Sequence, residues 1–220
     1  HADADAVVKT LSGQQARAFV AVQSRLLTNA QATREGVRAG LQWLEKAPGA
    51  NDVAVVFFSG HGVRDDGGKL FFVTREGKAE ALSETCLPWD EVDAALRQCP
   101  ARQVIFLMDC CHAGAFGDRQ VESGALAETL VKRAGVVVFA SSQGGEESLE
   151  NAQWKHGAFT RALLDGLSGK ADLLGTGAVN LSSLVAYVSE AVPALTEERQ
   201  HPWMPRAEQF DTRLRLAMLR

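Results

Sequence analysis

The stretch VIFLMDCCHAGAFG, residues 104–117, places two cysteines and a histidine between an apolar run and a glycine-containing turn. A continuous apolar run of this kind indicates a strand covered on both faces, as in the parallel sheets of α/β proteins. Three interpretations of the residues that follow it are open: a metal site, packed thiols or a nucleophile. The rest of the chain distinguishes between them.

Apolar runs and helical patterns alternate along the chain. Strands are expected at 53–58, 70–73, 104–108 and 136–140, with a weaker one at 17–22. Helices are expected after Thr33, after Pro88, around Phe159–Leu167 and after Asn180. This alternation predicts a mostly parallel sheet with helices on both faces, formed by residues 1–220 as a single domain.

Composition narrows the class of protein. A net charge of −4 over 220 residues gives no electrostatic footprint for nucleic acid. No apolar run approaches the roughly 18 residues of a membrane span. Four cysteines, two of them adjacent, make a poor disulfide framework, so we expect a reducing, cytoplasmic setting. The chain begins without methionine, and we expect a fragment or a processed form.

Two loops carry residues suited to catalysis. His61 stands between two glycines directly after one predicted strand, and Cys111 directly follows another. The carboxyl ends of parallel strands share one edge of a sheet, where ligands bind. A catalytic cysteine attacks as a thiolate and needs a nearby base. Taken alone, either residue fits a packing or loop role, but together they predict a Cys–His dyad.

The other interpretations of the Cys-Cys-His run are weaker. Zinc sites favour two to four residues between cysteines, and adjacent side chains point apart. A thiol redox sensor would need a strained disulfide between Cys110 and Cys111, which mass spectrometry under oxidant would detect. We expect His112 to cap a turn, and His156 and His201 to be surface residues.

The two motifs SGHG (59–62) and DCCHAG (109–114) resemble those of caspase-like cysteine peptidases, and are closest to bacterial metacaspase-like members. Three further segments share the resemblance: ATREGVRAGLQWL, VVVFASSQGGEES and HGAFTRALLDGL. The resemblance covers most of residues 3–215. It implies a caspase-like three-layer α/β/α sandwich with a mostly parallel central sheet, and the activity of a cysteine endopeptidase.

The resemblance also implies the catalytic roles. Cys111 would be the nucleophile, and His61 the base that activates it and protonates the leaving amine. Backbone N–H groups of Gly62 and Cys111 would hold the oxyanion. Cys110 stands where the family usually has a small residue, and we expect it to pack in the core.

Substrate selection is implied by three further positions. Asp109 matches the acidic residue of the metacaspase specificity pocket, which would pair with an arginine or lysine side chain. Ser59 matches a second pocket residue and Asp3 a third, on the helix after the family's first strand. That strand has no counterpart before Asp3 in this sequence, so the role of Asp3 in the pocket depends on a missing segment. The alternative is that Asp3 lies on a solvated face of its helix.

Metal binding is implied only in part. Asp118 and Asp90 match calcium ligands of some metacaspases, but RDDGGK (64–69) replaces a longer acidic loop. Asp65 and Asp66 are expected in a polar hairpin turn. We therefore expect that no cofactor is required, with calcium as a candidate.

The remaining expectations concern processing and partners. Family members are often cut after the catalytic motif, and Arg119 is the expected self-cleavage site. RQHPWMP (199–205) is expected to be a loop that covers the core near the sheet's end. Partners would be a protein or peptide substrate, with a regulatory domain, a partner protein or dimerisation through open edge strands also open. A catalytically silent scaffold is the alternative function, but a scaffold needs neither His61 nor Cys111.

Overall fold

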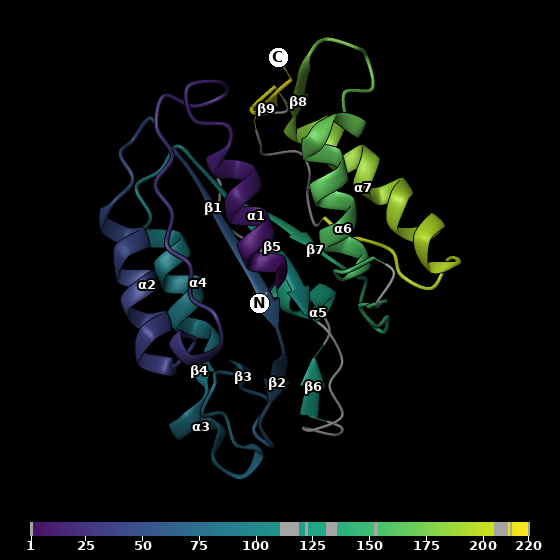
Figure 1. Ribbon diagram of the computed structural model, residues 1–220. Helices are drawn as coiled ribbons and strands as arrows, with labels where there is room; N and C mark the ends of the chain where they lie inside the picture. Colours follow the sequence, from purple (N-terminus) through teal and green to yellow (C-terminus); the bar gives the residue numbers. More distant parts are fainter. Residues whose placement is uncertain are drawn as a thin grey trace.

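A parallel sheet forms the centre of the computed structural model, which describes residues 2–110, 119–121, 123–130, 136–151, 154–204, 211 and 213–219. Within these residues the sheet has the strand order β1-β5-β7 (Figure 1). The bounds are Val53–Gly60 for β1, Gln103–Cys110 for β5 and Val136–Ala140 for β7. The α/β sandwich with a mostly parallel central sheet is confirmed.

Helices cover both faces of this sheet, and strand β5 is buried along its whole length. One face carries α2 (Arg34–Lys46) and α4 (Trp89–Gln98), seen on the left of Figure 1. The other carries α1 (Ala2–Ser12), α6 (Ala158–Asp165) and α7 (Leu181–Thr196). Because side chains alternate along a strand, Phe106 and Cys110 join the first core and Leu107 the second.

The predicted helix starts are confirmed by their caps. The Thr33 hydroxyl accepts a hydrogen bond from the Gly36 N–H at 3.0 Å, and helix α2 begins at the next residue. Asn180 and Ser183 form a reciprocal capping box at the start of α7. Pro88 stands immediately before α4, where its missing N–H costs nothing.

A small antiparallel sheet lies below the central one in Figure 1. In the described residues its order is β4-β3-β2-β6. The bounds are Gly62–Arg64 for β2, Leu70–Phe72 for β3, Leu87–Pro88 for β4 and Gln120–Val121 for β6. The strand expected at 70–73 is present as β3, but it pairs antiparallel with β2 and β4 in this small sheet and not in the central parallel sheet. The Asp65 carboxylate closes a hairpin by accepting from the Gly67 and Lys69 N–H groups, which returns β3 alongside β2.

Aromatic side chains join the two sheets. The ring centroids of Phe58 and Phe72 are 4.0 Å apart, those of Phe72 and Trp89 are 4.9 Å apart, and those of Trp89 and Phe106 are 6.2 Å apart. The contacts therefore run from β1 through the hairpin strand β3 to helix α4 and strand β5. They fix the hairpin, and with it the start of β2, against the end of the central sheet.

The strand expected at 17–22 is absent, since these described residues form turns and extended chain with a single bridge between Gln15 and Phe19. Ala16 has a left-handed φ of 58°, which breaks an extended strand. Val20 is 97% exposed, so this segment lacks the buried face that would stabilise a strand.

The other elements lie around these layers. They are α3 (Leu82–Thr85), α5 (Ser123–Leu130), β8 (Ala178–Asn180), β9 (Arg215–Met218) and short helical turns at 29–31, 79–81 and 166–170. None of the helices among the described residues is long and apolar enough to cross a bilayer.

The aromatic bridge predicts a large effect of Phe72→Ala. Phe72 is 3% exposed, and removing its ring leaves a cavity between the two sheets. We expect the free energy of unfolding in urea to fall by about 3–5 kcal/mol. Val20→Ala, at an exposed position, should stay within about 0.5 kcal/mol of the wild type. Equal effects of the two changes would contradict the role of the bridge.

Candidate active site

The site lies at the carboxyl edge of the central sheet, where β1 and β5 end side by side. The register pairs Ser59 with Asp109 and Gly60 with Cys110. His61 follows β1 directly and is half-buried, at the junction between β1 and β2. Ser59 is exposed at this edge. The end of β5, from which the chain continues to the predicted nucleophile, therefore lies beside the loop that carries the predicted base.

Several predicted residues cannot be placed. Cys111, His112 and Asp118 lie outside the described residues. Asp90 is exposed in the first turn of α4. Within the described ranges, no three His, Cys, Asp or Glu side chains gather in a way that could hold a metal ion. Calcium binding therefore stays a prediction.

Asp109 is a carboxyl group inside the protein, with an exposed fraction of 1%. The Thr160 hydroxyl, from the first turn of α6, donates a hydrogen bond to its Oδ2 at 2.7 Å. Its Oδ1 is buried and has no hydrogen-bond partner among the described residues. One oxygen is therefore anchored, and the other is left to accept a hydrogen bond.

Burial raises the pKa of Asp109 to about 6, because removal from water disfavours the charged form. The Thr160 hydroxyl and, more weakly, the Ser141 side chain oppose this shift in the pKa, and the negative charges of Asp3 and Glu150 add to it. Three acidic groups, from α1, β5 and the loop before α6, thus act on the same place. A cation entering there would be attracted by all three.

Gly157 allows the helix α6 to approach this carboxyl group. It stands at the N-cap of α6, and a Cβ added there would lie 3.1 Å from Asp109 Oδ2. The N-terminus of a helix also favours negative charge. Neither Gly157 nor Thr160 was predicted to have a role at this site. Their signal is a glycine directly before a predicted helix with a hydroxyl three residues later.

Asp3 and His156 form a pair beside Asp109. The Nδ1 atom of His156 and the Oδ1 atom of Asp3 are 2.5 Å apart, and the side chains are 17% and 12% exposed. His156 was expected to be a surface residue, and this prediction was wrong. The contact depends on α1 meeting the segment before α6, residues far apart in sequence. Asp3 is thus engaged rather than solvated.

The loop after β7, residues 141–151, is held by the segment 199–203. Gln200 is fully buried, accepts from the Leu149 N–H at 2.7 Å and donates to the Ser141 carbonyl at 2.8 Å. Trp203 pairs with Ala140 at the end of β7 through two backbone hydrogen bonds. The expectation that this segment covers the core is confirmed, since Trp203 packs against it.

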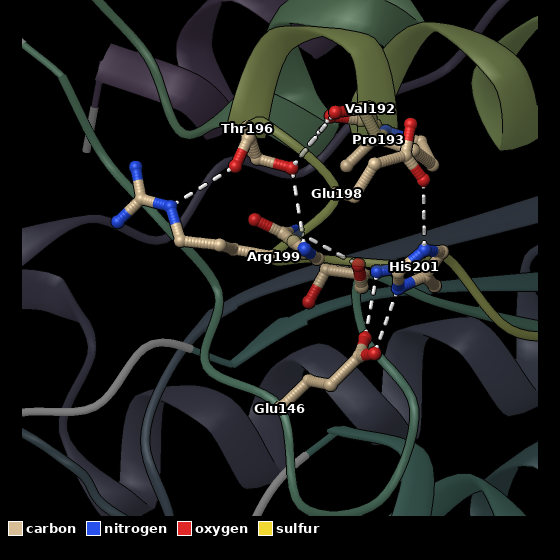
Figure 2. A network of polar contacts seen from close by, with 9 residues as sticks. Glu146, Val192, Pro193, Thr196, Glu198, Arg199 and His201 are labelled. Atoms are coloured by element: carbon tan, nitrogen blue, oxygen red, sulfur yellow. Dashed lines mark hydrogen bonds and ion pairs between the residues drawn. The ribbon is translucent and has the colours of Figure 1, made fainter.

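Figure 2 shows the outer part of the contact between the loop 141–151 and the segment 199–203, where Glu146 faces His201. The Glu146 carboxylate accepts from the His201 backbone N–H and contacts its ring Nδ1, both at 2.7 Å. This contact raises the pKa of His201 above its ordinary value, with a smaller contribution from Glu198. His201 lies near the surface, as expected, with 34% of its side chain exposed, and Glu146 holds it in place. These contacts fix the loop 141–151, which carries Glu150.

Cys110 is buried in the first core, as expected for a packing residue. Burial, and then the nearby Asp109 carboxylate, raise the pKa of its thiol well above the ordinary value. A thiol held protonated reacts slowly with oxidants and disulfides. This argues against a role for Cys110 as a redox sensor.

Arg119, the predicted self-cleavage site, directly precedes β6. Its Nη2 lies 3.0 and 3.1 Å from the two carboxylate oxygens of Asp66, and its Nη1 donates to the Ala79 carbonyl at 2.7 Å. Self-cleavage stays a prediction, but the guanidinium is engaged in this conformation.

Comparisons with known proteins agree with the fold. The sequence model of the caspase domain matches residues 1–212. A crystal structure of a protein from Geobacter sulfurreducens is similar, with 20% sequence identity and a TM-score of 0.64 over 100% of this chain and 89% of that one. At this identity the similarity concerns the fold. No significant match is found among curated proteins.

The buried carboxyl group predicts that Asp109→Asn stabilises the fold at neutral pH. The pKa of Asp109 is 3.8 in the unfolded chain and about 6 in the folded one, so its contribution is most favourable below pH 3.8 and is lost as the pH rises through 6. The loss is about 3 kcal/mol at pH 7. Urea unfolding of both proteins from pH 3 to 7 should show the variant's advantage growing by about this amount. A difference independent of pH would contradict the assignment.

Proposed function

The chain belongs to the caspase-domain family of peptidases, and we propose that this member is a cysteine endopeptidase that cleaves proteins after arginine or lysine. The proposed catalytic pair is Cys111 and His61. The proposed specificity pocket is formed by Asp109 with Asp3 and Ser59, and Glu150 adds negative charge to it.

The buried carboxyl group of Asp109 is the observation that carries this proposal. Carboxylates are almost never fully buried without a partner, because losing water costs more than a single hydrogen bond returns. Here the Thr160 hydroxyl anchors Oδ2 and the Ser141 side chain also acts on the group, while Oδ1 has no hydrogen bond of normal geometry among the described residues. A guanidinium or ammonium group of the substrate would complete this arrangement. Aspartate-selecting peptidases would need a basic group in its place.

In the first step, His61 takes the proton of the Cys111 thiol, and the thiolate attacks the carbonyl carbon after the basic residue. The Gly62 and Cys111 N–H groups donate hydrogen bonds to the oxyanion that forms. Stabilisation of this charge is often the largest contribution to the catalysis of acyl transfer. When the C–N bond breaks, His61 returns the proton to the leaving amine. The product is a thioester of Cys111 and a free amino terminus.

In the second step, His61 accepts a proton from water, and the hydroxide attacks the thioester carbonyl. The C–S bond breaks, the new carboxylic acid leaves, and the thiol of Cys111 is restored with the proton from His61. Neither step needs an oxidant, a reductant or a cofactor.

A catalytically silent scaffold is the rival function. A scaffold would gain nothing from a carboxyl group whose burial opposes folding at neutral pH, and an asparagine would fill the same space. The positions of His61 and Asp109 at one sheet edge also have no purpose in a docking module. These points favour the peptidase.

The proposal predicts cleavage of fluorogenic peptides that carry arginine or lysine before the scissile bond. A panel varying only this residue should be tested with the wild type, Cys111→Ala and His61→Ala, with and without calcium. Turnover of basic peptides should fall to background in both variants. Turnover only after aspartate would disprove the pocket assignment, and no turnover of any peptide would favour the scaffold.

The pKa of Asp109 predicts a pH-dependent preference. Below about pH 6 the free enzyme holds this carboxyl group neutral, and the attraction for a cation is lost. The ratio of kcat/KM for an arginine peptide to that for its citrulline analogue should therefore fall about tenfold from pH 7 to 5. The ratio cancels the titration of Cys111 and His61, which both peptides share. In Asp109→Asn the ratio should be low and independent of pH.

A further inference from the structure

We propose that His156 is a positioning residue of the specificity pocket, and that it holds the Asp3 carboxylate beside Asp109 against the repulsion between the two acidic groups. The inference rests on the proposed function, because Asp3 and Asp109 belong to the proposed pocket for arginine or lysine. His156 itself belongs to neither of the two catalytic motifs. Its contact with Asp3 joins residues that are 153 positions apart in the sequence.

Helix α1 brings Asp3 to the pocket. Asp3, Val7 and Leu11 follow one another at intervals of four residues, so their side chains lie on one face of the helix. Val7 is 2% exposed, and Leu11 packs against the second core. This face is turned inward, because α1 packs against α6 and β1. The first turn of α1 therefore carries a carboxylate on a face that is otherwise apolar.

The Asp3 carboxylate lies among like charges. The negative charges of Asp3 and Glu150 both act on the buried carboxyl group of Asp109. Repulsion between partly buried charges is screened much less than repulsion at the surface. Rotation about χ1 would carry the short Asp3 side chain toward water and would relieve this repulsion. A hydrogen-bond donor is therefore needed to keep the carboxylate in the pocket.

His156 supplies this donor. Its Nδ1 atom lies 2.5 Å from Asp3 Oδ1, and the side chains of His156 and Asp3 are 17% and 12% exposed. An ionised carboxylate can only accept hydrogen bonds, so the ring nitrogen is the donor. The contact uses one carboxylate oxygen and leaves the other to accept a hydrogen bond from a substrate cation.

The backbone on each side of His156 is held in place. Trp154 packs against the second core, and Gly157 is paired through the backbone with Glu150. Lys155, directly before His156, has a left-handed φ of 61°, which disfavours any side chain larger than that of glycine. Such strain persists only where the surrounding contacts enforce it. The orientation of the histidine is thus imposed by the fold.

A pocket held in this way binds a cation without first ordering its own side chains, and binding is tighter because that ordering costs affinity. His156 therefore acts on the binding of basic peptides and leaves the chemistry at Cys111 unchanged. The rival role is a positively charged His156 that neutralises Asp3. Removal of the ring would then strengthen the binding of basic peptides, so the two roles predict opposite signs.

Four variants test the positioning role. His156→Leu removes the donor and keeps an apolar side chain in its place. His156→Asn restores a donor, because the amide nitrogen stands as many bonds from the backbone as Nδ1 of the ring. Asp3→Asn is made alone and combined with His156→Leu. Glu91→Gln is the matched control, because it breaks the pair with Arg38 that joins α4 to α2 on the other face of the sheet. Both kcat and KM for an arginine peptide are measured for each protein, and urea unfolding checks that each is folded.

We expect His156→Leu to raise KM about tenfold and to leave kcat within twofold of the wild type, because the lost hydrogen bond is one to a charged group. His156→Asn should recover most of this loss. In Asp3→Asn, the further change His156→Leu should alter KM by less than twofold, because the carboxylate that the ring holds is already gone. Glu91→Gln should match the wild type in both constants.

An unchanged or lower KM in His156→Leu would overturn the positioning role while the peptidase stands. A fall in kcat as large as the rise in KM, or no recovery in His156→Asn, would likewise overturn it, because each indicates a general structural role. An equal effect of His156→Leu with and without the Asp3 carboxylate would show that the ring acts elsewhere. Absence of turnover in the wild type would overturn the proposed function, and this role of His156 with it.

Discussion

The parallel pairing of β5 with β1 is the constraint on which the rest of the structure depends. Side chains alternate along a strand, so a slip of one residue would exchange the two faces of β5. In the observed register Cys110 enters the apolar core and Asp109 faces α6. The same register ends β1 and β5 together, which brings the His61 loop to the start of the nucleophile segment. Buried apolar residues on both faces hold this register in place.

The sequence predicts the parts of the fold that depend on local pattern. The strands of the central sheet are continuous apolar runs, and Thr33 and Asn180 are residues typical of the N-caps at which α2 and α7 begin. The run 70–73 has the same apolar character, and only the tight Asp65 turn assigns it to another sheet. Segment 17–22 has strand composition but nothing to pack against. Pattern cannot distinguish such cases, because the difference lies in tertiary contacts.

The candidate site was predictable where the residues belong to motifs. His61 follows strand β1 and Asp109 lies near the end of strand β5, and their common edge follows from parallel pairing. Thr160 and His156 lie about 50 residues or more from their partners along the chain, and no spacing rule connects them. His156 was expected at the surface because an isolated histidine in a loop normally is. Its contact with Asp3 exists only because α1 crosses the start of α6.

The close approach of Gly157 to Asp109 limits how selectivity in this protein can evolve. There is room at residue 109 for a short side chain only, since the helix backbone lies against the carboxyl group. A single exchange to a basic residue would have to displace α6 and would still meet Asp3 and Glu150. Reversal of preference therefore requires coordinated changes on three separate elements. Lineages with this geometry should drift in loop length and surface charge while keeping the sign of their pocket.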